Sequence, residues 1–311
     1  MDTELLAGLE MLPMFDFSTV DIGAVRAGLA TWREAAAAPE MPDVQSAWLN
    51  APGPAGAPGV RVAMHRPMAA NGPLPAILHV HGGGYVLGEA TLDDIANRAL
   101  ALTLGCAIFS VDCRLAPETA HPGPVEDCYA ALNYVAANAG ALRVDAARIG
   151  VMGESAGGGL AAALALLARD RGGPGLAFQH LIYPMLDDRT CVAADPHPFT
   201  GEFVWGVAQN RYGWAALLGQ APGGADVSPY AAAARATDLS GLPPAFIAVG
   251  ALDLFLEENL EYARRLTRAG VPVEPHVYPG AYHGFQLAPG AAVTEAANRD
   301  SVAALRRALG T

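Results

Sequence analysis

One serine lies in a pattern that joins a strand directly to a helix. Residues 153–157 read Gly-Glu-Ser-Ala-Gly, with Ser155 at the centre. Residues 148–152 predict a short buried strand, and residues 156–170 predict a helix that begins at once. Such a unit lifts the serine hydroxyl above the sheet on a strained bend, where flanking glycines avoid Cβ clashes. An ordinary turn of small residues with an exposed serine can have the same five residues by chance. Whether Ser155 is a reactive serine therefore depends on whether residues elsewhere in the chain can act with it.

Predicted strands and helices alternate along most of the chain, which is the pattern of an α/β protein. Helical connections between strands imply a largely parallel sheet that is covered on both faces. The first two strands are close in sequence and predict an antiparallel edge. We therefore expect a single domain over residues 1–311, with a mostly parallel eight-stranded sheet flanked by helices. The predicted strands are 44–49, 60–66, 76–80, 106–111, 148–152, 178–183, 245–249 and 273–278, and the predicted helices are 91–104, 125–138, 156–170, 256–269 and 292–309.

A glycine triplet follows the third predicted strand, where residues 81–85 read His-Gly-Gly-Gly-Tyr. Glycines at this point leave backbone N–H groups free to turn toward a reacting oxygen, as in an oxyanion hole. The residue after the serine of an elbow supplies a further N–H group. We therefore predict Gly83, Gly84 and Ala156 as the donors. A phosphate-binding or purely conformational loop is the alternative, but neither a Gly-x-Gly-x-x-Gly pattern nor a lysine accompanies the triplet.

Two further side chains supply what a serine hydroxyl needs to react. Serine is a poor nucleophile without a neighbouring base, which a histidine held by a carboxylate provides. Asp253 follows the predicted strand 245–249, and His283 follows the strand 273–278. Active sites of open α/β sheets gather at these strand ends. We predict Ser155 as the nucleophile, His283 as the general base and Asp253 as the residue that orients it.

Other titratable residues compete for these roles. Glu257 and Glu258 are close to Asp253, but we expect them to lie in the first turn of the following helix, where negative charge is favourable. His79 and His81 form a His-x-His pair of the kind that can bind zinc. No convergent third ligand is visible in the sequence, so we predict no metal site.

The order serine, acid, histidine is that of an α/β hydrolase, and the surrounding segments resemble the hormone-sensitive-lipase-like group of bacterial carboxylesterases. The resemblance covers roughly residues 60–290. It implies the α/β-hydrolase fold and ester hydrolysis, and the triad chemistry requires no cofactor. Cys113 and Glu154 depart from the family pattern, which usually has tyrosine and aspartate there, and Leu-Phe-Leu-Glu-Glu after Asp253 departs as well. The matching segments are 81–84, 114–118, 124–127, 153–158, 253–254 and 283–285.

Two segments outside the alternating pattern predict a helical cap, since helices of this kind form a lid in the resembled family. They are residues 1 to about 48 and about 187–240, and the second is too long for an ordinary connection. We predict that Tyr85, Phe203 and Trp205 bind substrate, although packing within the insert explains the aromatic residues equally well. The first segment predicts one amphipathic helix with Leu5, Leu6, Leu9 and Leu12, and a second helix capped by Ser18, with Asp21 at its third position and a stripe of Ile22, Val25, Leu29 and Trp32.

Composition excludes several classes of function. The formal net charge of −12 disfavours nucleic acid and anionic membrane surfaces as partners. All 19 basic residues are arginine, which excludes Schiff-base chemistry, a Walker A site and the Ser-x-x-Lys type of hydrolase. We expect neither a signal peptide nor a transmembrane helix, because the first residues are not basic and no apolar run approaches about 18 residues. The cysteines show no metal spacing and predict reduced thiols and a cytoplasmic location; they are Cys106, Cys113, Cys128 and Cys191.

These observations favour a serine carboxylesterase for short- to medium-chain acyl esters, the chain length being implied by the resemblance. Hydrolysis of amides, carbamates or lactones stays open, because all of these reactions pass through similar tetrahedral intermediates. A non-catalytic small-molecule receptor is a further alternative, but receptors that resemble this family lack the histidine that His283 provides here. We expect a small-molecule ester as the partner, with no nucleic acid and no membrane, and we leave a homodimer open.

Overall fold

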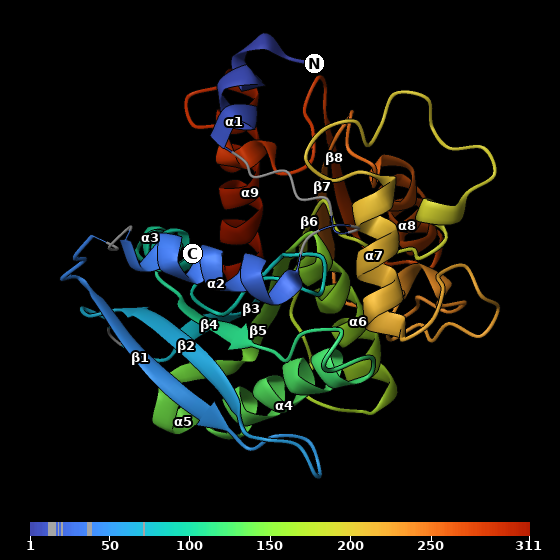
Figure 1. The fold of residues 1–311 in the computed structure, drawn as a ribbon. Coiled ribbons are helices and arrows are strands. Elements are labelled where there is room, and N and C mark those ends of the chain that lie inside the picture. The colour runs from blue at the N-terminus through green and yellow to red at the C-terminus, as the bar shows by residue number, and fades with distance from the viewer. Residues whose placement is uncertain (12–16, 18, 20, 36–38, 71) are drawn as a thin grey trace.

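An eight-stranded sheet forms the centre of the protein (Figure 1). The computed structural model describes residues 1–311 apart from 12–16, 18, 20, 36–38 and 71. The strands are β1 (Val44–Ala51), β2 (Val60–Pro67), β3 (Leu74–Val80), β4 (Ala107–Asp112), β5 (Val144–Glu154), β6 (Gln179–Ile182), β7 (Ala245–Gly250) and β8 (Val273–Tyr278). Their order is β1-β2-β4-β3-β5-β6-β7-β8. β2 is antiparallel to both of its neighbours, and the remaining pairs are parallel. The predicted α/β-hydrolase fold, with its antiparallel edge, is confirmed.

Helices cover both faces of the sheet. They are α3 (Asp94–Leu104), α4 (Gly123–Ala137), α5 (Ala139–Leu142), α6 (Ala156–Asp170), α8 (Leu256–Arg268) and α9 (Ala292–Leu309). The apolar residues of β3 alternate between the two layers because side chains of a strand point to opposite faces. Ile77 joins a cluster with Leu104 of α3, whereas Leu78 joins the cluster that contains Leu132 of α4. Within the described part of the chain, no helix has both the length and the apolar surface that a bilayer crossing needs.

Among the described residues before the sheet, the α-helices are α1 (Leu6–Met11) and α2 (Ile22–Ala35). The carboxylate of Asp21 accepts the N–H groups of Gly23 and Ala24, so Asp21 caps α2 from the position just before it. The prediction that Asp21 is the third residue of this helix is therefore wrong. Leu12, Ser18 and the Trp32 side chain lie outside the described residues. The other stripe residues pack against the main core, and they are Ile22, Val25 and Leu29.

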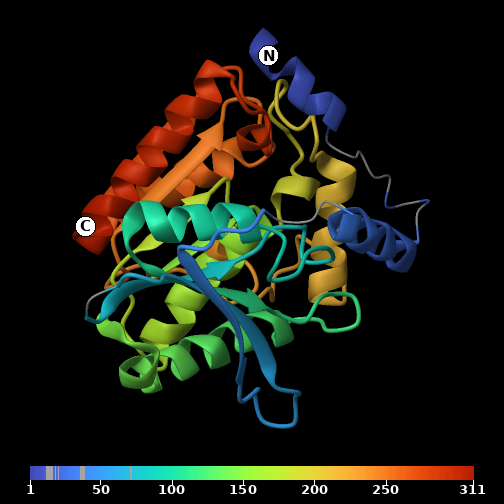
Figure 2. The ribbon, with the colours of Figure 1, turned by 90° about the vertical axis from the view of Figure 1, so that its left-hand side faces the viewer.

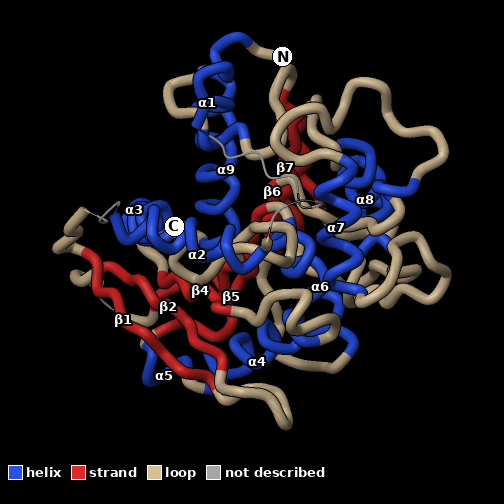
Figure 3. The backbone as a smooth tube through the Cα atoms, in the orientation of Figure 1, coloured by secondary structure: helices blue, strands red, loops and turns tan. Residues whose placement is uncertain are grey.

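The N-terminal helices and the long insert lie on the same side of the molecule. Figure 2 shows α1 and α2 gathered there with α7 (Val207–Leu218), the longest helix of the insert. The rest of the insert is mostly loop (Figure 3). Phe17 joins the two segments, since its ring stacks on Tyr212 of α7 at 5.1 Å and meets Trp205 edge-on at 6.0 Å. β1 already begins at Val44, so the N-terminal segment is shorter than the predicted 1–48.

Candidate active site

Ser155, His283 and Asp253 meet beyond the carboxyl ends of β5, β8 and β7. His283 Nε2 lies 2.9 Å from Ser155 Oγ, and His283 Nδ1 lies 2.8 Å from Asp253 Oδ2. The second oxygen of Asp253 accepts the N–H of Phe255 at 2.9 Å. The exposed fractions of the three residues are 7 % for the serine, 5 % for the histidine and 0 % for the aspartate. The imidazole is therefore held between a hydroxyl and a buried carboxylate, an arrangement in which it can take the serine proton.

The backbone at Ser155 is strained, as the elbow pattern predicts. Its φ is 57° and its ψ is −123°, one residue after β5 ends and one before α6 begins. This conformation is costly for a residue with a side chain, and surrounding contacts must maintain it. The N–H of Ser155 donates to the carbonyl of Ile182 at 2.9 Å. A Cβ on Gly157 would lie 2.1 Å from the carbonyl oxygen of Val80, so only glycine fits there.

The glycine loop after β3 lies beside the serine. A Cβ built on Gly82 would be 3.6 Å from the Cβ of Ser155. Gly83 and Gly84 have φ values of 117° and 61°, and the carbonyl of Gly83 accepts N–H groups from three and four residues later. Among the described residues, the N–H groups of Gly83, Gly84 and Ala156 donate to no protein acceptor. These groups are therefore available to a substrate oxygen.

Trp205 lies against the same loop. A Cβ on Gly84 would come within 2.2 Å of the Trp205 ring, so the indole occupies the space that a side chain at position 84 would need. The indole Nε1 donates to Asn210 Oδ1 at 3.3 Å, and the ring centroid is 6.3 Å from that of His283. Trp205 thus contacts the glycine loop and approaches the histidine, which is the position expected of a pocket-lining residue.

The other two residues predicted to bind substrate have different neighbours. Tyr85 is buried, its hydroxyl donates to the carbonyl of Met185 at 3.0 Å, and its ring packs on Trp214 at 5.2 Å. These contacts brace the glycine loop from the interior. The ring of Phe203 lies 6.1 Å from that of Tyr282, the residue before the histidine. For both residues, substrate binding stays a prediction.

Aromatic rings enclose His283 on further sides. The ring of Tyr183 lies 4.6 Å away, and Phe255 meets the imidazole edge-on at 5.2 Å with an interplanar angle of 89°. Both residues are buried, which keeps water from the imidazole flank. Neither residue lies in a sequence motif that predicts a role at the site. Their only signal is position, since Tyr183 directly follows β6 and Phe255 lies two residues after Asp253.

The buried His79 lies behind the elbow with two partly exposed carboxylates. His79 Nε2 is 2.9 Å from Glu154 Oε2 and 3.8 Å from Asp93 Oδ2. Burial alone would lower the pKa of His79, but the carboxylate of Glu154 raises it above the usual histidine value. His81 has different partners, because its Nδ1 donates to the carbonyl of Gly82 and its Nε2 lies by Cys113. The His-x-His pair therefore does not converge on one site.

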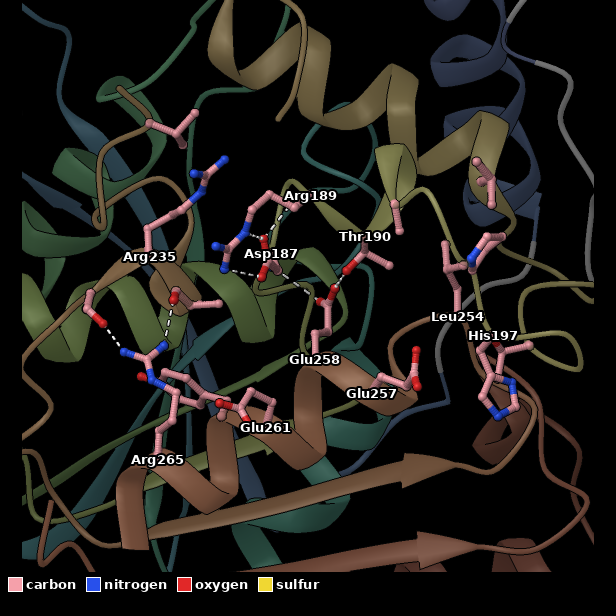
Figure 4. Close-up of a pocket in the computed structure, with 18 of the residues that line it drawn as sticks. Asp187, Arg189, Thr190, His197, Arg235, Leu254, Glu257, Glu258, Glu261 and Arg265 are labelled. Carbon is pink, nitrogen blue, oxygen red and sulfur yellow. Dashed lines mark hydrogen bonds and ion pairs between the residues drawn. The ribbon is translucent and has the colours of Figure 1, made fainter. Parts of the chain in front are cut away.

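The two competing acids face a separate cavity of about 730 Å³, which Figure 4 shows. Glu258 is buried in its wall, where its carboxyl group accepts the N–H of Leu186 at 2.7 Å and contacts the hydroxyl of Thr190. Burial raises the pKa of Glu258 well above the usual range. Glu257 lines the same cavity. The acid that contacts the histidine is Asp253 rather than either glutamate.

Comparison with known proteins agrees with the fold and the order of these residues. A family model described as the alpha/beta hydrolase fold matches residues 77–287. The chain belongs to this family. It is similar to esterase LipI of Mycobacterium tuberculosis, with 36 % identity over 97 % of this chain and 94 % of LipI. Carboxylesterase NlhH of the same species is 39 % identical over 80 % of this chain and 79 % of its own length.

Solved structures give the same result at nearly full length. A bacterial heroin esterase superimposes with a TM-score of 0.93 and 43 % sequence identity, over 99 % of this chain and 98 % of that one. Esterase LipW from Mycobacterium marinum gives a TM-score of 0.84 and 35 % identity over 99 % of this chain and 95 % of its own. The resemblance to the hormone-sensitive-lipase-like carboxylesterases is thereby confirmed.

Proposed function

We propose that Ser155, His283 and Asp253 are the catalytic triad of this carboxylic ester hydrolase, and that the reaction passes through an acyl-enzyme. The assignment to ester hydrolysis rests on esterase relatives that match nearly the whole chain. The observation that carries the mechanism is the continuous contact from hydroxyl to imidazole to carboxylate, at 2.9 Å and 2.8 Å. A complete triad also disfavours the alternative of a non-catalytic receptor.

In this mechanism His283 takes the proton of Ser155 as the oxygen attacks the ester carbonyl. The negative oxygen of the tetrahedral intermediate accepts hydrogen bonds from the N–H groups of the oxyanion hole, for which we propose Gly83, Gly84 and Ala156. The imidazolium then gives its proton to the departing alcohol, and a water molecule repeats the sequence on the acyl-enzyme. Asp253 holds the imidazole tautomer with the proton on Nδ1 and stabilises the imidazolium.

We further propose that the N-terminal helices and the insert form a cap that favours short- to medium-chain acyl esters. The support is the aromatic contact between the two segments, where Phe17 meets Trp205 close to the triad. The same triad can attack an amide, carbamate or lactone carbonyl, so the scissile bond is part of the test. A cytoplasmic location and a homodimer stay predictions.

Replacing Ser155 with alanine tests the mechanism. Turnover of p-nitrophenyl butyrate should fall by at least about 10⁴-fold, because the remaining groups cannot form the acyl-enzyme. Ser240→Ala is the matched control, since Ser240 is exposed and its replacement should leave the rate unchanged. A panel of p-nitrophenyl esters from acetate to palmitate, together with matching anilides, defines the acyl chain and the bond. Wild-type turnover in a folded Ser155→Ala variant would exclude the serine mechanism.

A further inference from the structure

Arg26 of helix α2 reaches from the N-terminal segment to two loops of the main domain. Its Nε donates to the carbonyl of Val86 at 2.8 Å, and its Nη2 donates to the carbonyl of Ala116 at 2.7 Å. The same guanidinium pairs with the carboxylate of Glu118 at 2.8 and 3.0 Å. One side chain therefore makes four hydrogen bonds to partners that are 60 to 92 positions away in sequence.

The two carbonyls belong to backbone that shapes the oxyanion loop. Arg26 holds the carbonyl of the peptide that joins Val86 to Leu87, and the N–H of that same peptide, from Leu87, donates to the carbonyl of Gly83 at 2.8 Å. The peptide that Arg26 holds therefore closes the turn around this glycine. The N–H of Ala116 donates to the carbonyl of Tyr85 at 3.0 Å. Arg26 thus bridges, from outside, two loops that are already hydrogen-bonded to each other. The planar guanidinium fork suits this task because it points at two acceptors in a fixed geometry.

The carbonyl bonds matter more than the ion pair. The Arg26 side chain is 26 % exposed, whereas that of Glu118 is 61 % exposed. An ion pair with so exposed a partner is screened by water and contributes little. The bonds to the two carbonyls lie in part-buried surroundings, where charge-assisted hydrogen bonds are stronger. Glu118 therefore offers a control that removes the charge partner and leaves both carbonyl contacts in place.

The glycine loop is held from its other side as well. Trp205 lies against Gly84, and Phe17 lies against Trp205. Helix α2 itself packs on the main core through Ile22 and Val25. The N-terminal segment consequently contacts the loop directly at Val86, through the guanidinium of Arg26, and is linked to Gly84 only through the Trp205 ring of the insert. If α2 moves away from the main domain, the contacts at Val86 are lost.

We propose that Arg26 is a positioning residue for ester hydrolysis, which couples the docking of α2 to the orientation of the N–H groups of Gly83 and Gly84. This inference rests on the proposed function, since it assumes that these groups bind the oxyanion. It makes the N-terminal segment part of the apparatus that stabilises the transition state, in addition to any part that it plays in shaping the pocket. Arg26 itself touches no reacting atom.

The test compares Arg26→Met, Arg26→Lys and Glu118→Gln, assayed with p-nitrophenyl butyrate well below their melting temperatures. Loss of one oxyanion donor costs about 10²–10³ in kcat, so partial misorientation in Arg26→Met should lower kcat by about tenfold or more, with KM nearly unchanged. Lysine keeps the charge without the fork, and Arg26→Lys should recover part of the rate. Glu118→Gln should stay within about fivefold of the wild type, because an exposed ion pair contributes little.

A trifluoromethyl ketone provides the second readout, because its oxygen becomes an oxyanion when serine adds to it. Its inhibition constant should rise in proportion to the fall in kcat/KM. An unchanged kcat in Arg26→Met, a rise in KM alone, or an unchanged inhibition constant would overturn the inference. If Arg26→Met does not fold, Arg26→Lys carries the same comparison. Failure of the proposed function has a different signature, which is wild-type turnover in Ser155→Ala.

Discussion

Replacing Asp253 with asparagine tests the orientation of the catalytic histidine. Both carboxylate oxygens are engaged, because Oδ1 accepts the N–H of Phe255 at 2.9 Å and Oδ2 faces His283 Nδ1 at 2.8 Å. An amide has only one oxygen. That oxygen must stay toward the Phe255 N–H, since two donors cannot face each other there. The amide NH₂ then points at His283 and stabilises the tautomer whose Nε2 carries the proton, which cannot accept the proton of Ser155.

The expected loss follows from this change of tautomer. A triad aspartate replaced by asparagine, with geometry intact, lowers kcat by about 10⁴. That ratio corresponds to about 5 kcal/mol of transition-state stabilisation, at about 1.36 kcal/mol for each factor of ten. The assay is kcat for p-nitrophenyl butyrate, measured beside a thermal melt. The melting temperature should change little although kcat falls strongly, because asparagine has nearly the same volume as the buried aspartate.

Two neighbouring carboxylates provide matched controls. Glu257→Gln and Glu258→Gln should each keep kcat close to the wild-type value, because both side chains face the cavity of Figure 4 rather than the histidine. Burial raises the pKa of Glu258, so a neutral amide suits its site. An Asp253→Asn variant with more than a tenth of the normal kcat, or a Glu257→Gln variant that is more damaging, would refute the reasoning.

Three further predictions address the glycine loop, the substrate pocket and the ion pair of His79 with Glu154. Gly84→Val should lower kcat by about 10² or more, because a side chain there clashes with Trp205. Gly28→Ala is the control, because there is open space around a Cβ at that position. A folded Gly84→Val variant with normal kcat would mean that the donors of the oxyanion hole lie elsewhere. Esters of about four to eight acyl carbons should outperform palmitate, as the proposed cap requires, and rapid hydrolysis of emulsified long-chain triglyceride would contradict it. Glu154 raises the pKa of His79 in the folded state, so the protonated pair stabilises the protein below about pH 6.5 and this stability is lost as the pH rises through the folded pKa. His79→Gln should therefore lower the melting temperature more at about pH 5.5 than at about pH 9, and an equal loss at both would show that the charge is not involved.

Most of the fold follows from local pattern. The strands and helices can be predicted because each has its own spacing of apolar residues along the sequence. The sheet then follows, because only a few ways of connecting these elements are compatible with a parallel sheet. The elbow is predictable as well. The turn at Ser155 is strained, and the carbonyl of Val80 leaves no room for a side chain at Gly157, so few other sequences can form it. The contact of His283 with Asp253 follows from the strand ends at which both residues stand.

Contacts between distant segments could not be predicted in the same way. The bonds of Arg26 to Val86 and Ala116 depend on how α2 lies on the main domain, and nothing in the local sequence fixes that placement. The packing of the Tyr85 ring on Trp214 joins the glycine loop to the insert, and it likewise depends on how distant segments meet. The start of α2 after Asp21 rather than after Ser18 could not be predicted, because Asp and Ser are both good caps and the helix can begin after either.

Direct detection of the acyl group on Ser155 tests the central claim. The enzyme is mixed with excess p-nitrophenyl butyrate, quenched in acid during the first turnover and digested for peptide mass spectrometry. The account predicts a peptide that carries one butyryl group, placed on Ser155 by fragmentation and absent from Ser155→Ala. The amount of labelled peptide should match the burst of p-nitrophenol. A burst with the butyryl group on another residue, or a burst that persists in Ser155→Ala, would contradict the account.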